Sequence, residues 1–395
     1  MRSRSLLPLA FASTFASVLD LPIWVRNTYS VVEVNVGSPP VPHFLLFDTG
    51  SATTWMVDAE CVESDTCHNG SGYPRTGYSA TASSTSEPMN TTTSIDYLGG
   101  VTSGSGILDV FTLPTVGNCS SPFSWTQSFL SANQSSWTTL PSDGFLGLAF
   151  SSIADANTTT LVETLMQDGL LDSTRFGLYL GTETNDTGAG AGNGLLTLGG
   201  SHEDVYSVEG SLAALNWSSL QVPGEDAQLW RTSMQYTVGK QAKNDTKHTV
   251  TALGSWAVFD TGAGRISVPD DVIEEIYASI GMNWTAILNH DVIPLCADFT
   301  DDWYLDVFFG DSDNPTQVRI TGAMLKTPGF ATGEDKYCWP PFDPSGVSGL
   351  FLMGAQFLQN YYTVFDFGGS EPANYSARIG FGRLKDEYKP VVGSV

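Results

Sequence analysis

One tetrapeptide occurs twice in this chain and limits its fold more than any other feature. Phe47-Asp48-Thr49-Gly50 recurs as Phe259-Asp260-Thr261-Gly262, 212 residues further along. At average residue usage, an Asp-Thr-Gly tripeptide is expected about 0.1 times in a chain of this length. Two apolar residues and a glycine follow each copy at a similar distance, as Phe145-Leu146-Gly147 and as Leu352-Met353-Gly354. The doubled pattern predicts a chain built from two related halves.

Local patterns indicate an all-β chain. Residues 29–36 alternate as YSVVEVNV, and both copies of the repeated motif end a short apolar run. The 40 glycines and 20 prolines supply turns. Only residues 160–168 and 270–280 are typical of helices, whereas residues 79–94 indicate a loop or a solvated strand. Glycine and proline interrupt the strand pattern near residues 213–230, where we expect the boundary between the halves.

The N-terminus indicates the compartment. Arg2 and Arg4 precede an apolar run from Leu6 to Ala16, which is typical of a secretory signal over residues 1–17 and is too short to span a bilayer. The alternative is a frayed apolar N-terminus. Asn-x-Ser/Thr sequons point to the same pathway. They lie at Asn69, Asn90, Asn118, Asn133, Asn157, Asn185, Asn216, Asn244, Asn283 and Asn374. We expect a secreted protein, with a vacuolar location as the alternative and no membrane segment.

Charge and side-chain chemistry exclude several function classes. The chain has 17 Lys and Arg against 42 Asp and Glu, a formal net charge of −25. It lacks the basic face that nucleic acids or anionic membranes require, so we expect neither as a partner. The acidic balance suits a protein that works in acid, where protonated carboxylates repel each other less. The five histidines show no ligand spacing, so we expect no metal and no cofactor.

The five cysteines are expected to be mostly paired in a secreted chain. We favour Cys61 with Cys67 and Cys296 with Cys338, each pair adding about 2–4 kcal/mol of stability in the chain-entropy model. Cys119 is left over, and we expect it to be a buried free thiol.

The repeated aspartates suggest acid-base chemistry. An apolar strand that ends in Asp-Thr-Gly presents a carboxylate at its end, and the glycine lets backbone N–H groups approach the oxygens. Two such sites that face each other share one proton, which raises one pKa. One carboxylate can then activate a water as general base while the other, protonated, donates to a carbonyl oxygen. Pepsin is the standard example of such a pair. The alternative is two unrelated turn aspartates.

The motifs together resemble those of pepsin-like, A1-type aspartic proteases over about residues 27–384. They are FDTGSATTW at 47–55, SIDY at 94–97 with GSGIL at 104–108, DGFLGLAF at 143–150, LLTLGGSHEDVYSVEGSL at 195–212 and FLMGAQFLQNYYTVFDF at 351–367. The resemblance implies a bilobal all-β acid-protease fold with a central cleft. It implies an N-terminal lobe over residues 27–212, a C-terminal lobe over residues 213–395 and one aspartate from each. The two favoured cysteine pairs match family disulfides.

The resemblance also implies residue roles. Asp48 and Asp260 would be catalytic, and Thr49 and Thr261 would interlock beneath them. The remaining residues implied are Gly50 and Gly262, which would supply amides to the carboxylates, Ser51, which would bond Asp48, and Tyr97 of a flap over the cleft, which would bond Trp55.

Departures from the family pattern carry expectations of their own. Ala263 stands where a hydroxyl is common, so we expect a pH optimum less acidic than that of pepsin. Gly264 lacks a hydroxyl that often contacts substrate, and Ala355 replaces a common Asp with a modest expected effect. The flap is predicted to be about two residues longer between Tyr97 and Gly106. No basic pro-segment precedes the first strand of the resemblance, which leaves a different regulation, a lost exon or an inactive protein as explanations.

Three functions remain open at this stage. The favoured one is a secreted, monomeric aspartic endopeptidase that cuts extended polypeptides between bulky apolar residues and binds pepstatin-type inhibitors. The second is a catalytically silent binding protein on the same scaffold. The third is a glycosylated wall or surface protein, which has no use for a symmetric aspartate pair.

Overall fold

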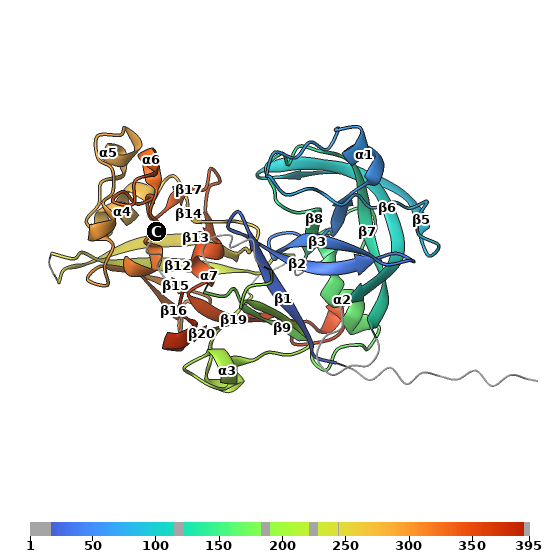
Figure 1. Cartoon of the computed structure of the whole chain (residues 1–395). Coiled ribbons are helices and arrows are strands. Elements are labelled where there is room, and N and C mark those ends of the chain that lie inside the picture. Colours follow the sequence, from blue (N-terminus) through green and yellow to red (C-terminus); the bar gives the residue numbers. More distant parts are fainter. Residues whose placement is uncertain (1–16, 114–121, 183–189, 221–227, 244, 391–395) are drawn as a thin grey trace, which may run out of the picture.

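Strands dominate this computed structural model, which describes residues 17–113, 122–182, 190–220, 228–243 and 245–390. Figure 1 shows β2, β3, β6 and β7 gathered on one side of the molecule and β12, β13, β15 and β16 on the other, with β9 and β19 between them. The expected bilobal all-β architecture is confirmed. The predicted signal at residues 1–17 lies almost wholly outside the described residues, as does Cys119.

The larger sheet has 13 strands and crosses from one half of the sequence into the other. Strands β19 and β20, near the C-terminus, join it through an antiparallel pairing of β19 with β9. In spatial order its strands are β11 (Asn216–Ser219), β20 (Arg378–Arg383), β19 (Tyr361–Asp366), β9 (Arg175–Tyr179), β10 (Leu195–Leu198), β1 (Leu19–Arg26), β2 (Tyr29–Val36), β3 (Val41–Asp48), β8 (Gly144–Gly147), β4 (Trp55–Val57), β7 (Phe123–Ser135), β6 (Gly100–Leu113) and β5 (Glu87–Tyr97).

The smaller sheet has seven strands, all from the second half. In spatial order they are β16 (Thr316–Thr321), β15 (Tyr304–Phe309), β12 (Arg231–Lys240), β13 (Lys247–Phe259), β18 (Leu350–Met353), β14 (Ile266–Val268) and β17 (Asp343–Pro344). The helices are short: α1 (Ala59–Glu63), α2 (Leu161–Gln167), α3 (Glu203–Tyr206), α4 (Ile273–Ser279), α5 (Trp284–Leu288), α6 (Phe330–Gly333) and α7 (Ala355–Leu358).

The internal repeat appears as two matching strand trios. In the first, β8 lies between β3, with which it runs parallel, and β4, with which it runs antiparallel. In the second, β18 lies between β13, parallel, and β14, antiparallel. Asp48 ends β3 and Asp260 directly follows β13, so the two repeated aspartates occupy equivalent places. The two related halves predicted from the motif are therefore present in the fold.

Burial explains the elements that the sequence predicted. Strand β2 covers residues 29–36 as expected, because Val32, Val34 and Val36 point into the core. Helix α4 presents Ile273, Ile276 and Tyr277 on one buried face, at the spacing of a helix. It begins three residues later than predicted, since Asp270 instead accepts a bond from the Gly346 amide.

Both favoured disulfides are confirmed, Cys61–Cys67 and Cys296–Cys338. The structure adds an element that the sequence did not predict. Strand β1 occupies the residues between the expected signal and Asn27 and pairs with both β10 and β2. These residues are therefore part of the folded lobe.

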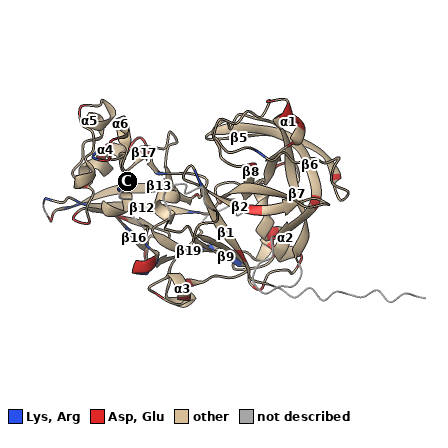
Figure 2. Cartoon of the chain, viewed as in Figure 1, with Lys and Arg blue, Asp and Glu red and all other residues tan. Residues whose placement is uncertain are grey.

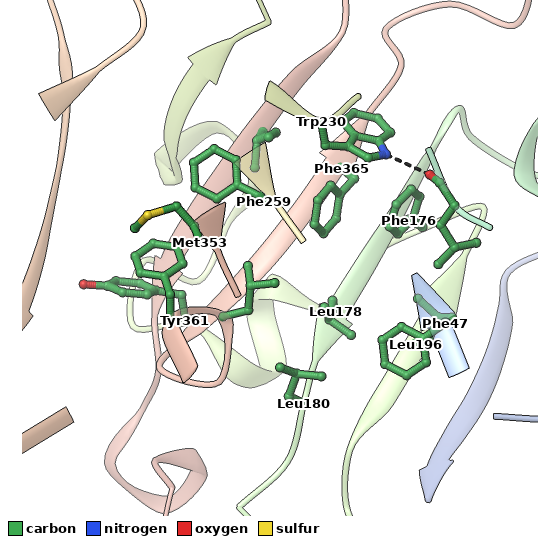
Figure 3. Packing of buried hydrophobic residues seen from close by; sticks show 14 of the residues in the cluster. Phe47, Phe176, Leu178, Leu180, Leu196, Trp230, Phe259, Met353, Tyr361 and Phe365 are labelled. Carbon is green, nitrogen blue, oxygen red and sulfur yellow. Dashed lines mark hydrogen bonds between the residues drawn. The ribbon is translucent and has the colours of Figure 1, made fainter. Parts of the chain in front are cut away.

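One continuous core supports the region where the strand trios meet. Figure 3 shows Phe47 of β3 and Phe259 of β13 in this core, together with Phe176, Trp230 and Phe365. The rings of Phe176 and Phe365 stack at 4.6 Å. Trp230 Nε1 donates to the Leu148 carbonyl at 2.8 Å, so residues of the two halves are fastened together beneath the aspartates.

Acidic residues outnumber basic ones throughout the chain, with 42 Asp and Glu against 17 Lys and Arg. Figure 2 shows acidic residues on both sides of the molecule and few lysines and arginines. Among the described residues, none of the helices combines the length and the apolar character needed to cross a membrane.

Candidate active site

A backbone hydrogen bond to the neighbouring parallel strand places each of the repeated aspartates. The Asp48 carbonyl accepts from the Leu148 amide at 2.8 Å, and the Asp260 amide donates to the Met353 carbonyl at 3.1 Å. Each aspartate thus sits where a parallel strand pair ends, with its side chain free of the ladder. Asp48 is 5% exposed, whereas Asp260 keeps a larger part of its surface open.

The threonines of the repeat lock the two halves together. The Thr49 amide donates to Thr261 Oγ1 and the Thr261 amide donates to Thr49 Oγ1, both at 3.0 Å. Thr49 Oγ1 donates in turn to the Phe259 carbonyl at 2.8 Å, and Thr261 Oγ1 donates to the Phe47 carbonyl at 2.7 Å. This reciprocal set is buried, so it fixes the relative position of the aspartates that precede the threonines.

Glycine is required next to each aspartate because the opposite carboxyl group lies against it. A Cβ on Gly50 would lie 2.4 Å from the carboxyl carbon of Asp260, and a Cβ on Gly262 would lie 2.6 Å from Asp48 Oδ1. The two amides are also donors: Gly50 bonds Asp48 Oδ1 and Gly262 bonds Asp260 Oδ1, each at 2.8 Å. The two carboxyl groups therefore face each other across this pair of glycines.

The two carboxyl groups differ in their donors. Ser51 Oγ donates to Asp48 Oδ2, and the equivalent position beside Asp260 is Ala263, which has no hydroxyl. Burial, followed by the charge of Asp48 and a hydrogen bond with it, raises the pKa of Asp260 well above its usual range. The Gly262 and Ala263 amides oppose this shift only in part. Burial and the neighbouring carboxylate thus both favour the protonated form of Asp260.

The predicted flap is a β-hairpin made of β5 and β6. Tyr97 pairs with Gly100, so the turn contains only Leu98 and Gly99. Leu98 is 77% exposed at the tip. Burial and the charge of Asp48 raise the pKa of Tyr97, which keeps its hydroxyl neutral.

The expected hydrogen bond between Tyr97 and Trp55 is not formed in this structure. The Tyr97 hydroxyl and Trp55 Nε1 are both buried, and neither has a hydrogen-bond partner among the described residues. Two buried polar groups without partners are costly for the free energy of folding.

Sequence reasoning missed two aromatic residues that surround Tyr97. The Tyr97 ring lies 5.4 Å from Phe145 and 5.8 Å from Trp137, and Phe145 also packs on Trp55 at 5.0 Å. Trp137 Nε1 is a third buried polar atom without a partner. Phe145 lies in a motif that had been singled out, but no local pattern distinguishes Trp137 from a core tryptophan.

The other departures from the family pattern, Gly264 and Ala355, lie on two segments that bond to each other: the turn after Asp260 and the start of α7. The Ala263 carbonyl accepts from the Ala355 amide at 2.7 Å, and the Gly264 carbonyl accepts from the Gln356 amide at 3.1 Å. Gly264 is exposed, with open space around its Cα. Ala355 thus holds this turn through its backbone, without the side chain. Within the described residues, no group of three or more His, Cys, Asp or Glu could hold a metal ion.

A two-lobed β fold that brings two aspartates of a repeated Asp-Thr-Gly motif together is that of an aspartic endopeptidase, a hydrolase. The chain belongs to the eukaryotic aspartyl protease family, whose model matches residues 29–373.

Curated relatives agree with this assignment at low identity. Gastricsin of Mus musculus is 23% identical over 367 residues, which cover 90% of this chain and 82% of gastricsin. Pepsin B of Canis lupus familiaris is 26% identical over 90% of this chain and 81% of its own length. Pepsin-2B of Gadus morhua is 26% identical over 84% of this chain and 91% of its own length.

Proposed function

We propose that Asp48 and Asp260 are the catalytic residues and that they hydrolyse peptide bonds without a metal or a covalent intermediate. The observation that carries the proposal is the reciprocal approach of the two carboxyl groups over Gly50 and Gly262. The close approach of the two carboxyl groups raises the pKa of Asp260. Aspartates with only a structural role in turns would gain nothing from such an approach, whereas shifted pKa values are typical of catalytic groups.

The donors suggest a division of roles. Asp48 accepts from Gly50 and Ser51, so it carries the negative charge and acts as general base on a water held between the carboxyl groups. Asp260 keeps the proton and donates it to the carbonyl oxygen of the scissile bond. The water oxygen then bonds to the carbonyl carbon while one of its protons passes to Asp48. The resulting tetrahedral diol collapses as its C–N bond breaks: Asp48 gives its proton to the leaving nitrogen, and one diol hydroxyl returns a proton to Asp260. Neutral Tyr97 closes over the substrate.

The specificity that we propose is for bulky apolar residues at the cleavage site. Tyr97, Phe145 and Trp137 form an aromatic cluster beside the aspartate pair, and an apolar side chain loses unfavourable contact with water when it packs there. The substrate is thus an extended polypeptide, and pepstatin-type compounds are the expected inhibitors.

The location that we propose is extracellular, with the enzyme acting as a monomer. Support comes from the N-terminal signal pattern and from the sequons, because six of the seven sequon asparagines among the described residues are exposed. The exposed six are Asn90, Asn133, Asn157, Asn216, Asn283 and Asn374. Loss of apparent mass after glycosidase treatment of the secreted protein tests this location.

Peptide-library cleavage from pH 2 to 7, with and without pepstatin, tests the activity. Asp48→Asn and Asp260→Asn are each expected to lower kcat by about 10⁴-fold or more while the fold is retained, because each removes one half of the acid-base pair. Asp168→Asn, at the exposed end of α2, is the matched control. Pepstatin binding without cleavage by the folded wild-type chain would instead establish a silent binding protein.

A further inference from the structure

The flank of the flap is fastened to the body of the molecule. Strand β7 pairs with β6 along its length, and the last pair in the ladder is Thr102 with Ser135, close to the tip of the hairpin. Two further bonds extend the contact. The Ser136 amide donates to the Val101 carbonyl at 2.9 Å, and the Val101 amide donates to Ser136 Oγ at 2.8 Å.

Trp137 supports the turn of the flap from the same side. A Cβ on Gly99 would lie 2.7 Å from the Trp137 ring, and a Cβ on Gly100 would lie 3.0 Å from it. The backbone of the turn therefore rests directly on the indole, an approach that any larger residue would prevent. The edge of the Tyr97 ring packs on the same indole at 5.8 Å.

The segment that carries Ser136 and Trp137 is itself held in place. Arg75 donates to the carbonyl oxygens of Trp137, Ser142 and Cys67. Cys67 is joined to Cys61 by a disulfide, so this arginine ties the segment to a covalently closed turn. The segment is thus bonded to the body of the molecule and supports the flap, whose tip at Leu98 is exposed.

We propose that Ser136 and Trp137, called here the flap clasp, are positioning residues that hold the flap closed and keep Tyr97 over the aspartate pair. The inference rests on the proposed function for its effect on catalysis, but the clasp itself is a structural claim. Opening the flap requires breaking two hydrogen bonds and separating the glycine turn from the indole. Substrate entry is therefore controlled from the side of the hairpin as well as from its tip.

Hydrogen exchange of the flap amides tests the clasp directly. In Ser136→Ala, the Val101 amide loses its acceptor, and its exchange is expected to become about fivefold faster. In Trp137→Ala, the peptide covering residues 96–102 is expected to exchange about tenfold faster or more, whereas Trp137→Phe, which keeps a ring under the turn, is expected to restore most of the protection. Ser124→Ala is the control, because Ser124 is exposed at the far end of the same strand pair.

Kinetics supply the second readout. A loosened flap weakens ground-state and transition-state binding alike, so the clasp predicts that Ser136→Ala raises KM about fivefold with little change in kcat. Flap exchange equal to that of Ser124→Ala in both clasp variants would overturn the proposal. If Trp137→Ala speeds hydrogen exchange throughout the chain, that variant has lost global stability, and flap exchange in Ser136→Ala alone tests the clasp. Faster flap exchange in the variants of a chain that cleaves no peptide would support the clasp and reject the proposed function. Unchanged flap exchange in the variants of an active protease would support the proposed function and reject the clasp.

Discussion

At the scale of single residues, the two aspartates are equal in position and unequal in donors. The matching amides of Gly50 and Gly262 give each carboxyl group one bond of 2.8 Å. Only Asp48 has a hydroxyl donor in addition, from Ser51. An ionised carboxylate gains more from a donor than a protonated one, so this single difference assigns the negative charge to Asp48 in our proposed mechanism.

A serine at position 263 should reduce this asymmetry. In Ala263→Ser, a new hydroxyl donor stabilises ionised Asp260, lowers its pKa and moves the alkaline limb of the kcat/KM profile to lower pH. Measurement of kcat/KM from pH 2 to 8 on one peptide checks this. Ser51→Ala is the reciprocal variant and should move the acidic limb upward. An unmoved alkaline limb in Ala263→Ser would contradict the explanation of a less acidic optimum by Ala263.

The sequence allowed prediction of those contacts that follow from a repeated motif. It predicted that Thr49 and Thr261 interlock, as they do in the structure, because the repeat implies a symmetric meeting of two similar turns. It did not predict Trp137 as a neighbour of Tyr97. That contact depends on how far β7 follows β6, and strand register is a tertiary property.

At the scale of elements, a buried ionisable pair lies where β3 and β8 begin to run side by side. His43 of β3 and Asp143, just before β8, are 1% and 3% exposed, and His43 Nδ1 lies 3.9 Å from Asp143 Oδ2. Burial, opposed by the Thr76 backbone, lowers the pKa of His43 to about 4. Burial also raises the pKa of Asp143 to about 6, against bonds from the Phe44 and Thr76 amides and the charges of Arg26 and Arg75.

These two shifts have opposite effects on stability. The lowered pKa of His43 means that the unfolded chain binds the extra proton, so its contribution is present above pH 6.5 and is lost as pH falls to about 4. The raised pKa of Asp143 means that the folded chain binds the proton, so its contribution is present below pH 3.8 and is lost as pH rises to about 6. Each contribution to the free energy of unfolding is on the order of 3 kcal/mol, so the two pH-dependent changes nearly cancel between pH 4 and 6.

In a variant without the histidine, Asp143 is the only member of the pair that still changes the free energy of unfolding with pH. His43→Phe is expected to gain about 2–3 kcal/mol of unfolding free energy relative to the wild type when pH falls from 6.5 to 4, whatever constant packing cost the ring adds. Urea unfolding at several pH values measures it. His68→Gln, whose side chain is 61% exposed, is the control. A pH-independent difference between His43→Phe and the wild type would show that the buried pair does not titrate as described.

Elements differed in how well they could be predicted. Strand β2 and helix α2 were predicted almost to the residue because each is long enough to show its period. Helix α1 was missed because five residues make little more than one turn. Its stability comes instead from Asp58, which accepts from the Cys61 amide, and from the disulfide that begins inside it.

At the scale of the whole molecule, the halves are joined by more than a linker. Strand β19 pairs with β9 across the middle of the sequence, and Tyr375 donates to Glu163 of α2 from the other half. The doubled motif predicted two halves but gave no sign of this shared sheet, because β9 and β19 lie far apart in sequence and neither has a pattern that names its partner. The resulting single core makes the aspartate pair a product of the entire chain.

The whole-molecule charge leads to the last prediction. With a formal net charge of −25, the folded chain repels itself at neutral pH, where its carboxylates are ionised. Salt screens exposed charges beyond roughly 8 Å at 0.15 M, so 0.5 M NaCl is expected to raise Tm by several degrees at pH 7 and by less than half as much at pH 4.5. Differential scanning calorimetry at both pH values measures this, with sorbitol as the uncharged control.

Ion pairs oppose this effect only weakly. Arg319 bonds Asp306 and Arg378 bonds Asp366 through two nitrogens each, with the carboxylates 5% and 8% exposed, so salt reaches these pairs poorly. Exposed pairs such as Lys389 with Asp386 add little stability to lose. Screening of repulsion should therefore dominate at pH 7. A Tm that falls with salt at pH 7, or that rises equally at both pH values, would show that self-repulsion does not limit the stability of this protease and that its acidity serves another purpose.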